Sequence, residues 1–488
     1  MSQNIKLNFI YNSIYQIAAI VIPVITTPYV SRVLGADGIG EYSYAFSIAY
    51  YFMLFIKLGL NNYGNRIVAS LRDDRAKLSQ TFFSIFVMQI LMLILFTGLY
   101  VIYVQGFATN KTLAYILVLY VISAGIDITW FFAGLEEFRL TVIRDFIIKI
   151  VTTICIFIFV NADNDTWKYT LILSLGASLS QLFLWLGIKS RIDIVIPKWK
   201  DISQHIKPNL ILFIPVVAVS LYNTMDKIML GSMVGSKEVG FYESSEKIIK
   251  IPVALVNSLG TVMLPRMANL YSNGTRNDEA NGLINKSIIF VMFLSTSIGF
   301  GIMTIANQFV PLFYGDGFEK CISLFYVLLP SCIFMSFANV IRTQYLIPQR
   351  MDRVYIISVF VGAGTNLIAN YLLIPQFQSI GAAIGTLIAE ISVCVVQIMA
   401  VSKKLDIKKY VYEASPFIIA GVLMFVTFRE FRIPELHTVA SLMIKIFLAG
   451  GVYLIVLCLL IFLYNRINPG MFNIYNVINK ILLKARKR

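Results

Sequence analysis

Four ionisable residues lie close together in one apolar part of the chain. The segment FYESSEKIIKIP, residues 241–252, contains Glu243, Glu246, Lys247 and Lys250. On a helix they form two i,i+4 pairs with the glutamate first, the favourable order for attraction between opposite charges. Ionisable groups at membrane depth are costly unless they face protein or water, so they indicate functional groups there. The segment is either an interfacial turn whose charges neutralise one another or part of a polar path through a membrane.

The composition places the chain in a membrane. Its 488 residues are 58% hydrophobic and 14% charged, with a mean hydropathy of +0.76, whereas soluble domains carry about 25% charged residues. Long apolar runs recur, each near the roughly 20 residues that a helix needs to cross the hydrocarbon. The sequence predicts an all-α integral membrane protein with about fourteen transmembrane helices, at residues 8–31, 39–61, 78–104, 112–134, 145–160, 168–188, 209–231, 239–264, 284–306, 321–341, 355–374, 379–401, 411–428 and 438–464.

The net charge of +15 follows this predicted topology. With both termini on one side, that side receives 29 of the 41 lysine and arginine residues, the other side receives seven, and five fall within spans. This asymmetry is the positive-inside pattern, and it predicts cytoplasmic termini. Basic charge distributed in this way is a topology signal and argues against nucleic-acid binding.

The sequence lacks the residues that are characteristic of several classes of function. The chain contains no GxxxxGK[ST] segment and therefore no ATP-binding loop of this kind. Its five cysteines show no CxxC or pairing framework and are expected to be free thiols. The two histidines are isolated, and the first apolar run is too long for a secretion signal. Since the extramembrane loops leave no room for a catalytic domain, we expect no enzymatic activity, no cofactor and no metal.

An internal repeat relates two parts of the chain at an offset of 200 residues. LGADGIGEYSYA at residues 34–45 aligns with VGSKEVGFYESS at 234–245, and IKLN at 5–8 aligns with IKPN at 206–209. Chance similarity between glycine-containing turns is the alternative, but both anchors precede corresponding spans. Six predicted spans separate them, an even number, so both halves enter the membrane in the same direction. We expect two parallel six-helix lobes, residues 1–206 and 207–402, followed by two extra helices and a basic tail in 403–488.

Polar side chains form matching faces on the repeat-related spans 2 and 8. At 100° per residue, each set falls within an arc of about 100° or less. The face of span 8 holds Glu243, Glu246, Lys247, Lys250, Asn257 and Thr261, and the face of span 2 holds Ser43, Ser47, Tyr50, Lys57 and Asn61. Span 7 adds Asn223 and Lys227. A face that is polar in both halves predicts a polar path between the lobes.

Three intramembrane carboxylates permit two interpretations. Asp127 and Glu390 are candidate proton or cation carriers, because a carboxyl group in a low-dielectric site can bind a proton more tightly. Each could equally be a hydrogen-bond partner between helices. Asp226 is a third candidate for a coupling ion, and it could instead orient its neighbour Lys227.

Four segments resemble a known family. They are WFFAGLEEF at 130–138, TQYLIPQRMDR at 343–353, LIPQFQSIGAAIGTLIAE at 373–390 and the LG…IGEY turn after span 1. In order and spacing they resemble the Wzx-type flippases of O-antigen and capsular repeat units. These flippases form the polysaccharide-transporter branch of the multidrug/oligosaccharidyl-lipid/polysaccharide (MOP) exporter superfamily, which also contains the MATE transporters. The resemblance covers nearly the whole chain.

The resemblance implies a fold, a substrate and partners. Such proteins are fourteen-helix bundles of two six-helix lobes. They move undecaprenyl-diphosphate-linked oligosaccharides from the cytoplasmic to the outer leaflet of a bacterial plasma membrane, for surface polysaccharide synthesis. Implied partners are this glycolipid, membrane lipids, a polysaccharide polymerase and a chain-length regulator. Spans 13 and 14 would serve the lipid tail, as in the related lipid II flippases.

The resemblance and the polar faces together give the expected site residues. The family has a cationic lumen, and the matching positions here are Lys57, Lys227, Lys247 and Lys250. The polar faces add Tyr50, Asn223 and Asn257 to the expected lumen, and we expect Glu243, Glu246, Arg32 and Glu41 to act in gating. Lipid II flippases use arginines in spans 1, 2 and 8, whereas here span 1 has only Arg32 and the other two carry lysines. Peptidoglycan precursor is therefore the less expected substrate.

Two other activities make different demands on the sequence. A drug or cation antiporter of the same superfamily would need a pocket dominated by carboxylates, and the lysine-rich faces argue against it. A membrane glycosyltransferase or polymerase would need a large external loop with catalytic residues, and the connections at 161–168 and 429–437 are too short.

Overall fold

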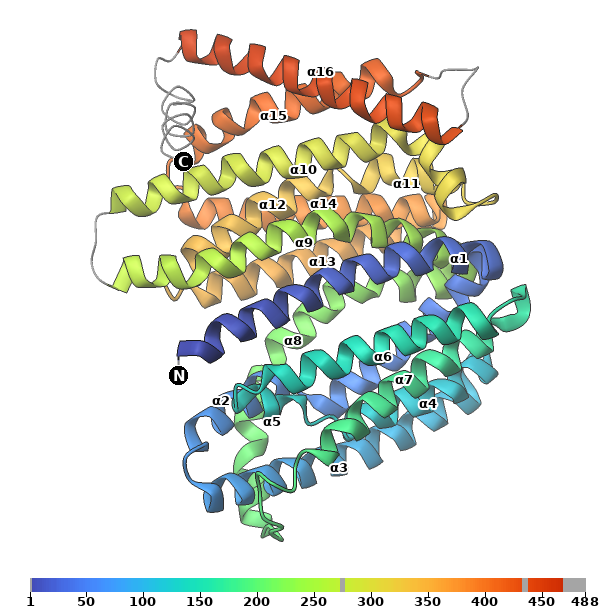
Figure 1. The fold of residues 1–488 in the computed structure, drawn as a ribbon, viewed down its shortest axis with the longest axis vertical. Helices are drawn as coiled ribbons and strands as arrows, with labels where there is room; N and C mark the ends of the chain where they lie inside the picture. Colours follow the sequence, from blue (N-terminus) through green and yellow to red (C-terminus); the bar gives the residue numbers. More distant parts are fainter. Residues whose placement is uncertain (1, 273–276, 432–437, 468–488) are drawn as a thin grey trace. The chain divides into compact units, whose positions relative to one another are not determined.

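The computed structural model describes residues 2–272, 277–431 and 438–467, and this part of the chain forms helices without any β-strand (Figure 1). The helices are α1 (Ser2–Lys57), α2 (Leu60–Leu71), α3 (Arg75–Gly106), α4 (Lys111–Gly125), α5 (Thr129–Gly134), α6 (Phe138–Phe159), η1 (Asp163–Asp165), α7 (Thr166–Leu186), α8 (Trp199–Met233), α9 (Ser236–Ser272), α10 (Asn277–Tyr314), α11 (Lys320–Leu328), α12 (Ser331–Ile341), η2 (Arg342–Leu346), α13 (Asp352–Phe377), α14 (Ser379–Val401), α15 (Ile407–Phe428) and α16 (Thr438–Ile467).

Helix α1 contains the first predicted span and the second as far as Lys57; the last residues of the second lie at the start of α2. Gly35 interrupts its helical geometry with φ of 63° and ψ of −175°, a conformation that glycine adopts at little steric cost. The interruption falls between the predicted spans 8–31 and 39–61. Each later predicted span lies in one helix, or in the pairs α4–α5 and α11–α12.

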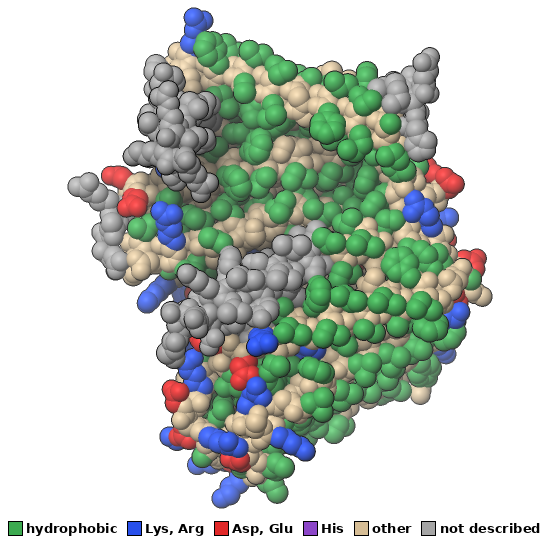
Figure 2. Space-filling model, viewed as in Figure 1, with side chains coloured by type: hydrophobic (Ala, Val, Ile, Leu, Met, Phe, Trp, Pro, Cys, Tyr) green, Lys and Arg blue, Asp and Glu red, His purple; other side chains and the backbone are tan. Residues whose placement is uncertain are grey.

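Twelve described segments are long and apolar enough to cross a membrane, against about fourteen predicted spans. One difference arises because the two spans in α1 count as a single segment. The other difference is that α6, which holds the predicted span 145–160, is not among the twelve segments. Its first half carries four charged residues, Arg139, Arg144, Asp145 and Lys149. The prediction of a polytopic all-helical membrane protein is confirmed. Figure 2 shows hydrophobic side chains over the middle of the helices and most charged ones near helix ends.

The chain divides into two compact units. The first comprises residues 1–247, 313–324 and 359–386, and the second comprises 248–312, 325–358 and 387–488. The lobe boundaries expected from the repeat remain a prediction.

In the first unit, α1 and α9 cross where the sequence repeats. A Cβ atom on Gly40 would overlap the carbonyl oxygen of Ser236, and a Cβ atom on Gly240 would overlap the carbonyl oxygen of Ala36. The two contacts are equivalent under the repeat. Position 40 corresponds to 240, and position 236 corresponds to 36, so each contact is the repeat counterpart of the other. Glycine is needed at both positions because the backbones touch there. The crossing supports the repeat, because matched positions occupy matched environments.

The motif WFFAGLEEF in the first unit is largely packing. Trp130, Phe131 and Phe132 are at most 1% exposed, and Phe82 of α3 stacks on Trp130 with ring centroids 5.5 Å apart. The acidic end of the motif anchors the connection after α7, because Glu137 accepts three hydrogen bonds from Arg191, the shortest at 2.5 Å.

In the second unit, α15 and α16 lie beside one another, and α16 makes polar contacts with α10 (Figure 1). Thr296 of α10 shares a hydrogen bond of 2.9 Å with Tyr453, and Gln308 donates to Ser441 over 3.3 Å. The buried Lys445 of α16 donates to the carbonyl of Arg429, just after α15, over 3.2 Å. Helix α16 is therefore attached to α10 at Thr296 and Gln308 and to the end of α15 through Lys445.

Candidate functional site

Lys227 in α8 lies between two glutamates of α9. Its Nζ is 2.5 Å from Glu243 Oε2 and 2.9 Å from Glu246 Oε2, and the side chain is 11% exposed. Lys247, one turn after Glu243, places its Nζ 3.5 Å from Glu243 Oε1, which is the first of the two predicted i,i+4 pairs. Two ammonium groups and two carboxylates thus pair with one another in this cluster. Buried charges are tolerated when they are paired in this way.

The segment at 241–250 is part of the continuous helix α9. Phe241, Tyr242, Ser244 and Ser245 on this segment are buried. Its charges therefore meet other helices of the first unit as well as one another.

Ser43 connects this cluster to α1. Its hydroxyl donates to Glu243 Oε2 over 3.1 Å, and Ser43 is 4% exposed. The two residues are 200 positions apart, so the polar faces that the repeat equates are in direct contact here. Asp37 and Lys237, a further pair at the same offset, form an exposed ion pair with Nζ and Oδ2 3.9 Å apart.

Lys57, at the end of α1, forms an ion pair with Asp127 in the connection between α4 and α5. Asp127 Oδ1 accepts hydrogen bonds from the backbone N–H and the hydroxyl of Thr129, at 2.8 and 2.5 Å. The Lys57 side chain is 24% exposed and that of Asp127 is 7% exposed. The pair lines a cavity of about 410 Å³ that also contains Lys149 and Asp145. The sequence had suggested Asp127 as an ion carrier or a helix contact, and its observed partner is a lysine.

Asp226 is surrounded by neutral hydrogen-bond donors from three other helices. Tyr242 of α9 donates to Oδ2 over 2.6 Å, Asn370 of α13 to Oδ1 over 2.5 Å and Thr386 of α14 to Oδ2 over 3.0 Å. Asn370 is fully buried, and its Oδ1 accepts no hydrogen bond. Although Asp226 and Lys227 are consecutive, the helix directs them to different neighbours. The carboxylate and the amide oxygen beside it have the chemistry of a small-cation site.

The other predicted site residues lie away from these clusters or in the second unit. Tyr50 packs its ring near Tyr51, with centroids 6.3 Å apart, and Asn223 is exposed. Arg32 donates to the carbonyl of Pro28 over 2.9 Å. The second unit holds Lys250, which is exposed, Asn257, which accepts from Asn339 over 2.6 Å, and Glu390, which is 4% exposed.

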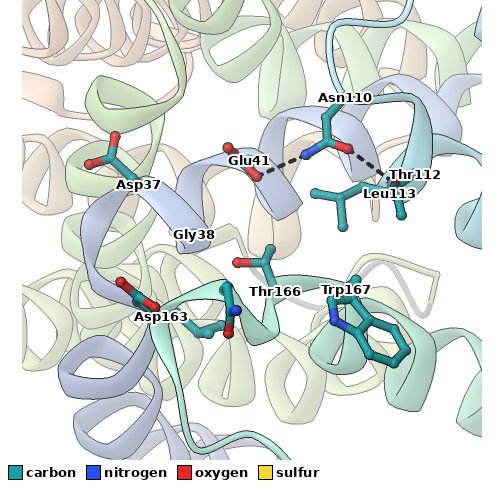
Figure 3. A pocket seen from close by; sticks show the side chains of 11 residues that line it. Asp37, Gly38, Glu41, Asn110, Thr112, Leu113, Asp163, Thr166 and Trp167 are labelled. Atoms are coloured by element: carbon teal, nitrogen blue, oxygen red, sulfur yellow. Dashed lines mark hydrogen bonds between the residues drawn. The ribbon is translucent and has the colours of Figure 1, made fainter.

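Glu41 belongs to a pocket at the α1 turn, lined by residues of three connections (Figure 3). Asn110 donates to Glu41 Oε2 over 3.0 Å, and Asp163 and Trp167 line the same pocket of about 530 Å³. The topology predicts all three connections on one side of the membrane, and they meet here. Among the described residues, no group of three or more histidine, cysteine or acidic side chains could hold a metal ion.

Sequence reasoning missed several partners of the predicted residues. Tyr242, Asn370 and Thr386 come from three helices, and only their polarity inside apolar spans could have indicated them. Glu238 was also missed, although it accepts from Lys320 over 2.6 Å and from the Ser379 hydroxyl over 2.5 Å. All five cysteines are free, as predicted.

Comparisons with known sequences place these clusters in a family context. The family described as "Polysaccharide biosynthesis protein" matches residues 5–271. The "Putative O-antigen transporter" of Escherichia coli strain K12 is 22% identical over 411 residues, which are 82% of this chain and 97% of the relative. The "Probable flippase AglR" of Haloferax volcanii is 28% identical over 214 residues, which are 42% of this chain and 44% of the relative.

Solved structures share the fold. A structure of "Lipid II flippase MurJ, inward closed conformation" has a TM-score of 0.73 at 15% identity and covers 94% of this chain and 99% of that one. An inward-facing multidrug resistance MATE family transporter of the MOP superfamily has a TM-score of 0.55 at 15% identity and covers 79% and 99%. The predicted fold class is confirmed. The family match extends over more than half of the chain, so this chain belongs to the polysaccharide biosynthesis protein family, and its predicted resemblance to the Wzx-type flippases of the MOP superfamily is confirmed.

Proposed function

We propose that the chain carries undecaprenyl-diphosphate-linked oligosaccharide repeat units from the inner to the outer leaflet of a bacterial plasma membrane, for O-antigen or capsule synthesis. It does so by alternating access and catalyses no covalent reaction. The family and its flippase relatives support transport of a lipid-linked saccharide. Both termini are cytoplasmic in this proposal, and a polymerase and a chain-length regulator act on the delivered product.

The observation that carries the proposal is the ion pair of Lys57 and Asp127 beside a cavity that Asp145 and Lys149 also line. A lysine that faces a cavity can exchange its carboxylate partner for a phosphate oxygen, since both are anionic acceptors. Asp127 keeps its two hydrogen bonds from Thr129 after such an exchange. Lys57 therefore captures the diphosphate in this scheme.

Lys227, Glu243, Glu246 and Lys247 form the gate of the proposed cycle. In the structure their charges are paired across α8 and α9. Arrival of a diphosphate would offer Lys247, with its side chain 31% exposed, a competing anion. Lys250 and Asn257 would take part later in the passage, with Tyr50 and Asn223 facing the saccharide and Arg32 and Glu41 closing the outer end.

A complementation series tests the cationic path. Lys57→Ala, Lys247→Ala and Lys250→Ala are each expressed at wild-type levels in a strain that lacks its own O-antigen flippase, and surface polymer is measured. We expect loss of polymer with Lys57→Ala and partial loss with the other two. Full polymer in all three variants would refute the assignment.

Within the proposed cycle, Asp226 is the favoured carboxylate for a coupling ion. Asp127 is already neutralised by Lys57, whereas the observed partners of Asp226 are hydroxyl and amide groups that can turn toward a cation. Transport by Asp226→Asn should lose its dependence on Na⁺ or pH, with Asp127→Asn and Glu390→Gln as comparisons. An unchanged ion dependence in Asp226→Asn would exclude this role.

Two related activities are alternatives within the same superfamily. The Asp226 cluster is also what a cation-coupled drug exporter would need, and the fold is shared with a lipid II flippase. Resistance to lipophilic cations on expression would favour the first, and rescue of a strain depleted of its lipid II flippase would favour the second. Restoration of surface polymer without either effect is the expected result.

A further inference from the structure

The connection between α7 and α8 in the first unit presents apolar side chains outward. Two ion pairs hold it in place, Arg191 with Glu137 and Arg75 with Asp193, the latter with Nη2 and Oδ1 2.7 Å apart. Ile192 between them is buried, but the following Ile194 and Ile196 are 90% and 91% exposed. No other large hydrophobic side chain in the described part of the chain is more exposed. The anchoring shows that the outward position of these isoleucines belongs to the fold.

Lysines and a tryptophan accompany the exposed isoleucines. Lys189, Lys198 and Lys200 are exposed, and Trp199 is 65% exposed. The nearby acidic groups are already engaged, since Asp193 pairs with Arg75 and Asp201 accepts from the backbone N–H of Lys198 over 3.1 Å. Tryptophan and lysine next to apolar residues are typical of the headgroup level of a bilayer. This connection therefore carries positive charge at a membrane surface.

The first turns of α8 continue this surface along the helix. Lys200, Ser203 and Lys207 recur at helical spacing, and Leu210, Ile211 and Ile214 follow on the same face. Leu210, Ile211 and Ile214 are 44%, 57% and 55% exposed. A groove of about 580 Å³ runs along this face, lined by Ser203, Ile206, Lys207, Leu210, Ile211, Phe213 and Ile214. At 1.5 Å per residue, the face changes from cationic to apolar within roughly 10 Å.

We propose that this surface, which we call the α8 lipid site, binds an anionic phospholipid of the surrounding bilayer. The headgroup phosphate lies at Lys200 and Lys207, and one acyl chain lies along Leu210, Ile211 and Ile214. The lysines lie at the start of α8 and the apolar side chains lie further along the helix. A phospholipid has the same arrangement, with its phosphate at the membrane surface and its acyl chains extending into the membrane. Lysines grouped at a membrane surface attract an anionic headgroup more than a zwitterionic one. The site is separate from the transport residues and does not depend on the proposed function.

Quenching of Trp199 fluorescence tests the site in the intact chain. The protein is placed in phosphatidylcholine nanodiscs that contain increasing fractions of brominated phosphatidylglycerol or brominated phosphatidylcholine. The Trp199 signal is the difference between wild type and Trp199→Phe. We expect half-maximal quenching at a fraction of brominated phosphatidylglycerol about tenfold lower than that of brominated phosphatidylcholine. The triple variant Lys198→Ala/Lys200→Ala/Lys207→Ala should remove this preference.

A matched triple variant serves as the control. Lys403, Lys404 and Lys408 are exposed lysines at another basic connection, and their replacement by alanine should leave the tenfold preference intact. Equal quenching by the two lipids, or an equal loss in both triple variants, would overturn the proposal. Displacement of phosphatidylglycerol by stoichiometric undecaprenyl phosphate would also overturn it, because the site would then belong to the transported lipid.

Discussion

Lys57 and Lys227, two lysines of the first unit that pair with carboxylates from other parts of the chain, differ in how their charge is balanced. Lys57 has one carboxylate partner, faces a cavity and has a side chain that is 24% exposed. Lys227 has two carboxylate partners on a neighbouring helix and a side chain that is 11% exposed. If Lys57 leaves Asp127, one anion remains, and Thr129 still donates to it. If Lys227 leaves its site, Glu243 keeps its contact with Lys247, but the two neighbouring carboxylates lose the cation that they share.

This difference suggests two roles. We call the Lys57–Asp127 pair the exchange site, because its lysine can change partners, and the Lys227 cluster the clamp, because it joins α8 to α9. Removal of the cation beside a buried carboxylate strongly destabilises the folded protein. Two close carboxylates also repel each other. Lys57 is therefore suited to release its partner during a transport cycle. Lys227 is suited to hold α8 and α9 together until another cation or a helix movement replaces it.

The largest expected effect is on stability, and it concerns Lys227. Lys227→Met leaves Glu243 and Glu246 without their shared cation, so the free energy of unfolding should fall by about 3–5 kcal/mol. Lys57→Met should cost clearly less, because Asp127 retains its hydrogen bonds. Unfolding of both purified variants in a denaturing detergent series measures the difference. An equal loss in the two would break the distinction between clamp and exchange site.

The second effect is on transport and is isolated with charge-balanced double variants. Lys57→Met/Asp127→Asn removes the exchange pair without leaving an unpaired charge, and transport should fall about 10- to 100-fold, the value of a lost charged hydrogen bond. Lys227→Met/Glu246→Gln leaves the Glu243–Lys247 pair and should change transport much less. Surface polymer per molecule of flippase is the readout. The reverse order would assign substrate capture to Lys227.

A smaller effect is expected at Ser43, which donates to Glu243 across the repeat. Ser43→Ala removes one hydrogen bond to a charged group and should lower the free energy of unfolding by about 1–2 kcal/mol. Ser47→Ala is the matched control, since the Ser47 hydroxyl donates to the carbonyl of Ser43 within the same helix. If the two variants lose equal stability, the contact between α1 and Glu243 contributes nothing of its own.

The smallest effect is expected at the exposed pair of Asp37 and Lys237. Their side chains are 61–65% exposed and the charged atoms are 3.9 Å apart, so Asp37→Asn should change stability by less than about 0.5 kcal/mol. The measurement is the same detergent unfolding series, at low and at high salt. A loss comparable to that of Ser43→Ala would show that charge pairing at the surface also holds the crossing.

Much of the fold and part of the site could be predicted from the sequence. Apolar runs are long and local, so the spans and the repeat were visible, and the i,i+4 rule predicted the contact of Glu243 with Lys247. The partners of Lys57, Lys227 and Asp226 lie on other helices, and nothing local determines which helices meet. Gly35 was part of the repeat pattern, but its interruption of a continuous α1 follows from backbone geometry that composition does not reveal.

The crossing at Gly40 and Gly240 has the property of an isologous interface, in which residue i meets residue j and j meets i. Position 40 approaches 236, and position 240 approaches 36. Such reciprocity is what two identical protomers produce on a two-fold axis, so the crossing has the form of a homodimer contact within one polypeptide. In a true homodimer, one mutation changes both sides at once. Here the two sides mutate independently, which allows a serine at 43 to face a glutamate at 243 and makes one half of the transporter chemically different from the other.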